Sequence, residues 1–287
     1  MAVPLPHTEE TSEGNNYLSI NRWACNPLTN VENIVRDFEV RHDDVFVTGY
    51  AQSGTDWLAS LLQQLYDWGT PRVTDNGLIP TLELASTPVK MGYTECTRAP
   101  SPRLIKSHLP YQCFPRHHFH GKTIVMIRNP KDVCVALYGS LCANQPDNHI
   151  LSWNDFVSEF LCGNLPYGSW MAHSTDWLEN KPANTLFVKY ENLKYNLRKE
   201  IGSVLEFLGL PVTGAAIDSL ATDYQLSATI NLGNKLGFSN NDCRAYFAYR
   251  DFDDVGCWKK YFSVAQSDLM DEALSEMRER GHGMFLK

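Results

Sequence analysis

Four short apolar runs, each followed by a more polar stretch, set the hydrophobic pattern of this chain. The runs are rich in β-branched residues and lie at about 45–49, 103–107, 123–127 and 185–190. Helical patterns follow near 57–62, 133–138 and 196–208, and the C-terminal half is mostly helical. Strands that alternate with helices are typical of parallel sheets. The pattern therefore predicts an α/β fold with a central, mostly parallel sheet flanked by helices.

The length of the chain favours one domain. A chain of 287 residues can bury a single large core, and it contains no linker rich in Gly, Pro or Ser, no internal repeat and no low-complexity tract. Residues 1–15 are polar and are expected to form a flexible N-terminal tail. We therefore take residues 16–287 as the folded domain.

The net charge and the cysteine pattern indicate which partners are disfavoured and which cellular compartment to expect. A net charge of −8 disfavours nucleic acid and anionic membrane surfaces. No apolar run approaches the roughly 18–20 residues of a membrane span, and the N-terminus lacks the pattern of a secretory signal. The eight cysteines form no C-x-x-C pair and are expected to be reduced thiols. These features predict a cytoplasmic protein that binds neither nucleic acid nor a membrane.

The first apolar run leads through a turn of small residues, Ser53-Gly54-Thr55, into a helical pattern. A strand that enters a helix through such a turn builds an anion cradle, because free backbone N–H groups and the positive end of the helix dipole point at one place. The Walker A spacing is absent. Gln52 stands where a phosphate loop would profit from a lysine. An ordinary strand–turn–helix of an α/β core explains this segment equally well by itself.

The other apolar runs also end in residues that suit an anion site. Lys106 and His108 end the second run, where Lys can neutralise phosphate or sulfate and His can act as a general base. Arg128 ends the third run and can fork onto a phosphate; an ion pair with Asp132 is the alternative. Tyr190 ends the fourth run and can contact a purine, or it can belong to the core. Ligands bind at the carboxyl ends of strands in open α/β sheets.

Together these segments resemble the cytosolic sulfotransferase family. Residues 50–57 match its Y-P-K-S-G-T-T-W loop, and residues 106–110 match its K-T-H-L-P. Further matches follow at 128–133, 167–177, 190–191, 205–209 and 258–266. Seven motifs in order, from about residue 45 to the C-terminus, make a chance likeness implausible. The resemblance implies a P-loop-like strand–loop–helix that holds the donor 3′-phosphoadenosine 5′-phosphosulfate (PAPS), and no metal.

The resemblance also assigns roles to individual residues. His108 would take the proton of the acceptor, a hydroxyl or amine on a small, largely apolar molecule. Lys106 would balance the charge of the transferring group, and Gln52 occupies the position of the family's catalytic lysine. Arg128 would grip the 3′-phosphate and Trp57 would stack on adenine. The full donor site would comprise Gln52, Ser53, Gly54, Thr55, Asp56, Trp57, Arg128, Ala136, Tyr190, Ser227, Thr229 and Arg250. The segment 259–268 approximates the family's dimer motif and suggests a homodimer, but an ordinary helix start at Ser263 explains the same residues almost as well.

The departures from the family pattern gather at the donor site. Gln52 replaces a lysine that stabilises the leaving phosphate, and Asp56 replaces a neutral threonine. An acid beside the phosphates should repel the donor unless Lys106 or another cation pairs with it. Ala136 lacks the hydroxyl of the family's serine. Further along, Asp251 follows Arg250 in an acidic segment, and Ser227-Ala228-Thr229 lacks the aromatic residue of the family's adenine wall.

Two functions therefore stay open. The chain is either an active sulfotransferase with an altered donor pocket, or a protein of this fold with weakened or lost PAPS use. The second protein would bind a ligand without catalysis, or act on another phosphorylated or sulfated compound. A P-loop kinase is disfavoured, because neither a Walker lysine nor a clear magnesium carboxylate is present.

Acceptor identity is less marked in the sequence. The loops at 23–27, 78–88, 137–148 and 233–247 are expected to line an apolar pocket, with Glu83 or His149 as candidate contacts to a polar substituent. His117, His118 and His120 form a cluster that no nearby Cys or acid completes as a metal site. We expect a solvated loop there.

Overall fold

The structure is a computed structural model. It describes residues 31–66, 79–84, 92–115, 121–144, 151–165, 167–211, 214–215, 217–219 and 254–285. Among the predicted site residues, Ser227, Thr229 and Arg250 lie outside these ranges, as do Asp251, His149 and the histidines at 117, 118 and 120. The predicted tail at 1–15 lies outside them too, so its boundary with the domain stays a prediction.

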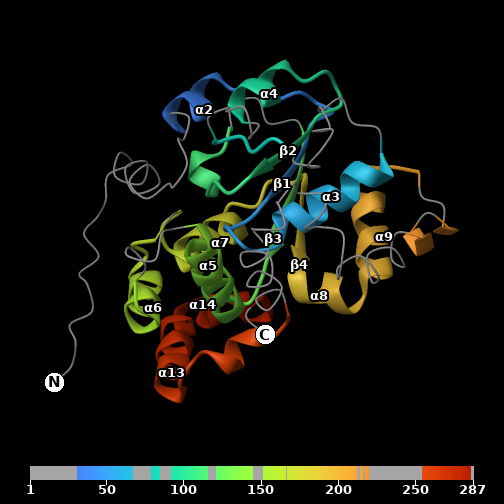
Figure 1. The fold of residues 1–287 in the computed structure, drawn as a ribbon. Coiled ribbons are helices and arrows are strands. Elements are labelled where there is room, and N and C mark those ends of the chain that lie inside the picture. Colours follow the sequence, from blue (N-terminus) through green and yellow to red (C-terminus); the bar gives the residue numbers. More distant parts are fainter. Residues whose placement is uncertain are drawn as a thin grey trace.

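A four-stranded parallel sheet forms the centre of the fold, as the sequence predicts (Figure 1). Its strands are β1 (Val45–Thr48), β2 (Leu104–Ser107), β3 (Lys122–Ile127) and β4 (Thr185–Lys189), in the spatial order β2-β1-β3-β4. In the register, Val47 pairs with Lys106 on one side and with Ile124 on the other. The carboxyl ends of β1 and β2 therefore lie side by side.

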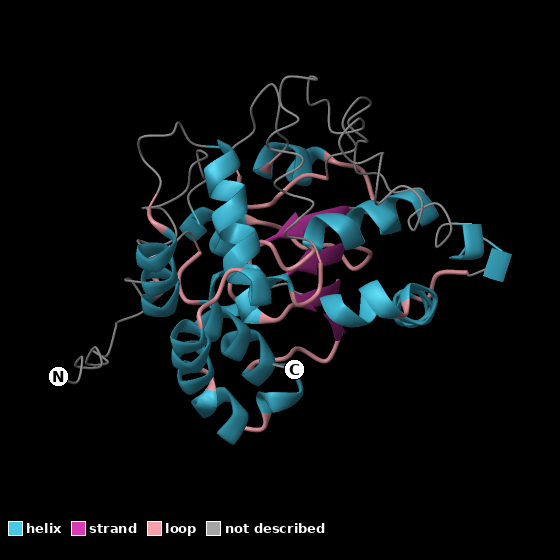
Figure 2. Ribbon diagram, turned by 60° about the horizontal axis from the view of Figure 1, so that its bottom comes forward, coloured by secondary structure: helices cyan, strands magenta, loops and turns pink. Residues whose placement is uncertain are grey.

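Helices cover both faces of the sheet (Figures 1 and 2). One layer contains α3 (Thr55–Leu65), α8 (Tyr190–Tyr195) and α9 (Leu197–Leu208); the other contains α2 (Val31–Asp37), α5 (Pro130–Asn144), α6 (Trp153–Cys162) and α7 (Trp170–Glu179). Successive strand residues point to opposite faces. Val45 and Val47 accordingly pack in the first layer and Phe46 in the second. All three are buried, which explains why these strands are apolar at consecutive positions.

The remaining elements are shorter or peripheral. They are α4 (Tyr93–Arg98), η1 (Tyr111–Cys113), η3 (Cys257–Lys260), α13 (Val264–Ala273), α14 (Ser275–Glu279) and η4 (His282–Phe285). Lys131 on α5 joins the C-terminal helices to the core, because its Nζ donates to Ser267 Oγ at 2.7 Å and to Asp271 Oδ2 at 2.8 Å. The C-terminal segment thus packs beside α5, close to the end of β3.

An ion pair holds the opposite edge of the sheet, where the strands begin. Arg103 precedes β2 and Asp44 precedes β1, and Arg103 Nε donates to Asp44 Oδ1 at 2.7 Å. Both side chains are buried, and Arg103 also donates to the carbonyls of Cys96 and Glu39. Hydrogen bonds on both partners are what makes a buried ion pair tolerable. This pair fixes the starts of two strands whose carboxyl ends carry the candidate site.

The structure corrects one expectation from the sequence, the end of the fourth strand, and agrees with another, the free cysteines. The fourth strand was expected to run through residue 190, but β4 ends at Lys189 and Tyr190 begins α8. The six cysteines in the described ranges are free thiols, as expected. No helix of the described part of the chain is long and apolar enough to cross a membrane.

Candidate functional site

The loop between β1 and α3 is folded tightly against the sheet. Gly49 has φ 152°, Gln52 φ 67° and Gly54 φ 93°. A Cβ at Gly49 would lie 2.4 Å from the carbonyl oxygen of Met126, and one at Gly54 would lie 2.5 Å from the Tyr190 ring. Both close approaches require glycine. The small residues of this turn therefore serve a loop pressed onto β3 and α8.

The N-terminal end of α3 has the donors of an anion site. Its N-cap, Gly54, makes no side-chain cap, so first-turn N–H groups are left without that partner. Ser53 is buried, and its Oγ has no hydrogen-bond partner among the residues that the structure describes. Thr55 is buried next to it. A buried hydroxyl without a partner beside a helix N-terminus suits an oxygen-rich anion, such as the 5′-phosphate expected from the resemblance.

Asp56, in the first turn of α3, forms an ion pair with Lys106 at the end of β2. The Lys106 side chain is only 9% exposed, whereas that of Asp56 is 56% exposed. Desolvation by the surrounding protein raises the pKa of Asp56, but the charges of Lys106 and His108 lower it more, so it falls below the usual 3.8. Asp56 is therefore ionised at neutral pH, and it partly neutralises the cation of the site.

His108 follows β2 directly and is half-buried. Its Nδ1 lies 3.0 Å from the carbonyl oxygen of Gly49. A carbonyl only accepts hydrogen bonds, so this contact assigns the proton of the neutral ring to Nδ1. The lone pair is then on Nε2, the nitrogen that a general base needs. The strand end thus presents an imidazole in the tautomer suited to taking a proton.

Glu83 holds the segment that carries His108. It is fully buried; its Oε1 accepts from the His108 backbone N–H at 2.8 Å and its Oε2 from Ser107 Oγ at 3.0 Å. The Tyr167 hydroxyl also bonds to Glu83, and the Tyr167 ring meets the His108 ring edge-on at 5.4 Å. The sequence suggested Glu83 as an acceptor contact. The structure shows a carboxylate bonded within the protein, which positions His108.

Two residues of α7 fix the other side of the same segment. His173 Nε2 lies 3.1 Å from the carbonyl oxygen of His108, and Trp177 Nε1 donates to the carbonyl of Leu109 at 3.1 Å. Both side chains are buried. Burial lowers the pKa of His173 from 6.5 to about 4, although its bond to the His108 carbonyl favours the charged form. His173 is therefore neutral near pH 7 and is a structural group.

We expect His173→Gln to flatten the loss of stability on acidification. The folded-state pKa of about 4 lies below the unfolded value of 6.5, so the unfolded chain binds the extra proton between these two values. In the wild-type protein, the contribution of neutral His173 to the free energy of unfolding should be fully present above pH 6.5. It should fall by up to about 3 kcal/mol as the pH approaches 4. Urea unfolding at pH 7.0, 5.5 and 4.5 measures this slope. His282→Gln, at a partly exposed histidine, is the control, and equal slopes in all three proteins would refute the assignment.

Arg128 joins the loop from the end of β3. It is 2% exposed, its Nη1 donates to the carbonyl of Gln52 at 3.0 Å, and its guanidinium lies 4.2 Å from the centre of the Tyr190 ring. Asp132, the acid considered as its partner, accepts from the N–H groups of Gly256 and Trp258 at 2.8 and 3.0 Å. Arg128 therefore contacts the loop between β1 and α3, and Asp132 binds the C-terminal segment instead.

Aromatic residues form a wall beside the loop. The rings of Trp57 and Tyr190 meet edge-on at 5.6 Å, and Lys194 Nζ lies 5.0 Å from the centre of the Trp57 ring. Tyr190 is buried, as the core alternative required, and Trp57 is half-buried. Ala136 is buried in α5.

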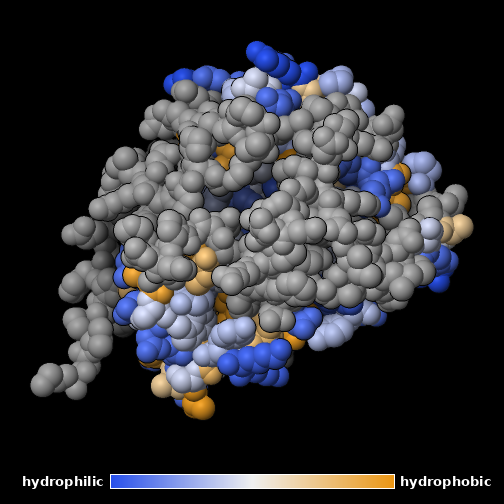
Figure 3. Space-filling view, in the orientation of Figure 1, coloured by the Kyte–Doolittle hydropathy of each residue, from blue (hydrophilic) through white to orange (hydrophobic). Residues whose placement is uncertain are grey.

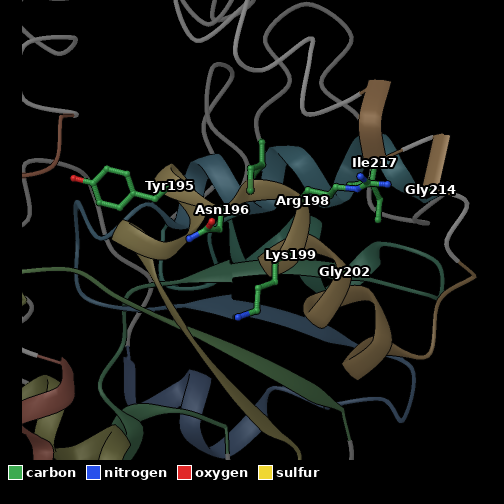
Figure 4. Close-up of a pocket in the computed structure, with 8 residues that line it drawn as sticks. Tyr195, Asn196, Arg198, Lys199, Gly202, Gly214 and Ile217 are labelled. Carbon is green, nitrogen blue, oxygen red and sulfur yellow. The ribbon is translucent and has the colours of Figure 1, made fainter.

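A separate cavity of about 600 Å³ lies where α8 meets α9. Its lining, drawn in Figure 4, is Tyr195, Asn196, Leu197, Arg198, Lys199, Gly202, Gly214 and Ile217. Arg198 extends toward Ile217 in that view and pairs with Asp218 at 3.1 Å. None of the predicted site residues lines this cavity, so it is distinct from the candidate site.

Comparison with known proteins decides the family. The family model described as "Sulfotransferase domain" matches residues 42–281. The chain belongs to the sulfotransferase family. It is 32% identical to Sulfotransferase 1E1 of Bos taurus over 83% of this chain and 84% of that protein, and 30% identical to Sulfotransferase 2A6 of Rattus norvegicus over 90% and 93%. These matches confirm the family inferred from the motifs.

Solved structures agree with this assignment. The mouse sulfotransferase SULT7A1 was solved in complex with 3′-phosphoadenosine 5′-phosphate (PAP). It superimposes with a TM-score of 0.67 at 28% identity, over 86% of this chain and 88% of that one. A retinol dehydratase superimposes with a TM-score of 0.65 at 20% identity, over 85% and 82%. The second likeness supports the fold alone. Both agree with a single α/β domain built on the parallel sheet.

Proposed function

We propose that this member of the sulfotransferase family transfers the sulfuryl group of PAPS to a hydroxyl or amine of a small, largely apolar acceptor, with His108 as the general base. The observation that carries the proposal is the tautomer of His108. Its Nδ1 is engaged by the Gly49 carbonyl at 3.0 Å, which leaves Nε2 to accept the proton. Lys106 lies in the same strand end, two residues earlier.

The donor fits the loop between β1 and α3. Its 5′-phosphate would be held by Ser53 Oγ, which has no hydrogen-bond partner in the described part of the chain, and by the N–H groups at the start of α3, with Thr55 beside them. Arg128 would take the 3′-phosphate, with Trp57 and Tyr190 against the adenine. When bound, the donor supplies a sulfuryl group on a phosphate leaving group. The complex of mouse SULT7A1 with PAP supports this choice of nucleotide.

The protein contributes chiefly position and charge to this reaction. His108 Nε2 takes the acceptor proton as the acceptor oxygen or nitrogen attacks. Glu83 and His173 hold the backbone of His108 from two sides, at 2.8 and 3.1 Å. A base fixed in this way needs little reorganisation when the proton moves, which is the main source of rate in transfers with weak covalent assistance.

The alternative function is binding without efficient PAPS use, or chemistry on another phosphorylated or sulfated compound. The ion pair between Asp56 and Lys106 favours it, because it occupies the cation expected to balance the transferring group. Gln52 adds no charge to compensate. Both functions predict an anion site, but only the first predicts transfer.

Titration calorimetry with 3′-phosphoadenosine 5′-phosphate (PAP), the desulfated donor, separates the two. We expect binding in the micromolar range, with at least about tenfold weaker binding of AMP, since a charge-assisted bond to the 3′-phosphate is worth about 1.5–3 kcal/mol. A screen of phenols, alcohols and amines with sulfur-labelled PAPS then tests transfer. Absence of PAP binding, or equal binding of AMP, would reject the proposal in favour of the alternative.

A homodimer is part of the same proposal. The predicted segment 259–268 runs from η3 into α13, where Val264 is 79% and Leu269 is 55% exposed. Figure 3 shows hydrophobic residues at the lower end of the molecule, where Figure 1 places α13. Apolar side chains on a surface helix suit an interface with a second copy. Sedimentation equilibrium measures the mass, and a monomer at tens of micromolar would contradict the dimer. The cytoplasmic location stays a prediction.

A further inference from the structure

The charge at the start of α3 is the feature of this site that departs most from its family. Where the family loop has a lysine and a threonine, this chain has Gln52 and Asp56. One positive charge is lost and one negative charge is gained, so the formal charge falls by two units. Asp56 does not lie unpaired beside the loop, because it forms an ion pair with Lys106.

The two partners of this ion pair differ in their freedom. The Lys106 side chain is 9% exposed and comes from β2, an outer strand of the sheet, whereas the Asp56 side chain is 56% exposed. The ammonium therefore cannot easily leave the site, while the carboxylate has room to turn away. An anion that enters the loop must either displace Asp56 from Lys106, which leaves the carboxylate unpaired, or bind without the help of the Lys106 charge.

We propose that Asp56 is a specificity-determining residue that competes with the donor's 5′-phosphosulfate for Lys106, so that nucleotide binding is accompanied by uptake of a proton at Asp56. The proposal rests on the proposed function, since it concerns the donor of that same site. It makes donor affinity dependent on pH, with tighter binding in mildly acidic solution. It also makes nucleotides with fewer negative charges at the 5′ end the better ligands.

The charged and titratable groups around Asp56 support this competition. Lys106 of β2 contacts it, His108 lies near enough to lower its pKa, and Tyr167 feels its charge across the site. When an anion takes the place of Asp56 at Lys106, the Asp56 carboxylate loses its main attraction and faces a like charge, so its affinity for a proton rises. The proton is taken from solvent and stays on the Asp56 carboxyl while the nucleotide is bound.

The test compares PAP binding by the wild-type protein, Asp56→Thr and Asp56→Asn at pH 5.5, 6.5 and 7.5. At pH 7.5 we expect both variants to bind PAP at least about tenfold more tightly, as expected when a like charge within a few ångströms of the phosphate is removed. The wild-type protein should gain more affinity on acidification than either variant. Calorimetry in two buffers of different ionisation enthalpy should show greater proton uptake by the wild-type protein.

Asp218→Asn is the matched control, because Asp218 is an exposed carboxylate paired with Arg198, which lines the separate cavity that contains none of the predicted site residues. It changes the net charge by the same unit and should leave PAP affinity within about twofold of the wild type. Equal affinities and equal proton uptake in wild type and both Asp56 variants would overturn the inference and leave the proposed function standing. Failure of every variant to bind PAP at every pH would reject both.

Discussion

His108→Ala should abolish sulfuryl transfer, with kcat lowered by about 10²–10⁴, the range that a positioned general base contributes. PAP affinity should stay within about threefold of the wild type, because the donor is expected to be held by the β1–α3 loop and Arg128. The structural reason is that the Gly49 carbonyl assigns the ring proton to Nδ1 and leaves the lone pair on Nε2, the atom proposed to take the proton. Transfer assays with labelled PAPS and PAP calorimetry measure the two quantities separately.

The controls for this prediction separate the base from its supports. His108→Gln keeps a hydrogen-bonding side chain without a basic imidazole nitrogen, and it should be as inactive as His108→Ala. Glu83→Gln should retain the base but loosen its support, since Glu83 Oε1 and Oε2 both accept hydrogen bonds from this segment. Normal turnover in either His108 variant would remove the base assignment. Loss of PAP binding together with turnover would make His108 a donor ligand.

The fold is readable from the sequence because both faces of the parallel sheet are buried. Strands such as Val45–Thr48 are then apolar without alternation, and they stand out as short runs between amphipathic helices. The boundary at Tyr190 is harder to predict. An aromatic residue favours a strand by propensity, yet Tyr190 starts α8, where its ring lies over Gly54 and under Arg128. Tertiary packing, and not local propensity, therefore determines the secondary structure at Tyr190.

The site is readable only in part, for a related reason. Ser53, His108 and Arg128 follow strands and Lys106 is the last residue but one of β2, so one rule on the carboxyl ends of strands finds all four. Glu83 has no such signal: it reaches His108 because residues near it pair with β2, through the Leu82 N–H and the Lys106 carbonyl at 2.8 Å. His173 matches a family motif, but only the fold shows that it bonds the His108 carbonyl.

For the ion pair of Asp56 with Lys106, the sequence states a condition, and only the structure shows that the condition is met. The sequence predicts that an acid at position 56 repels the donor unless a cation pairs with it. The structure supplies the cation, because the β1–β2 register aligns the ends of these strands and the start of α3 follows β1. The Asp56 charge is thus balanced within the protein, and this balance is the basis of the proposal that the pair affects donor affinity.

Gln52→Lys should raise kcat with PAPS by about 10²-fold, because one charged donor to a leaving oxyanion is worth about 10²–10³ in rate. The substitution is compatible with the loop. Position 52 has φ 67° whatever its side chain, and its carbonyl stays bonded to Arg128 Nη1 at 3.0 Å. The new ammonium would also attract Asp56, and it would thereby release Lys106 to the transferring group.

A double-mutant cycle with Asp56→Thr makes this prediction specific. If the added charge and the removed acid act on the same ion pair, the two substitutions together should raise kcat/KM by less than the product of their separate effects. Gln64→Lys, at an exposed position of the same helix, adds an equal charge away from the loop and should change kcat less than twofold. A fall in kcat for Gln52→Lys, with PAP affinity retained, would mean that the pocket depends on the neutral amide of Gln52 and that the missing lysine does not limit the reaction.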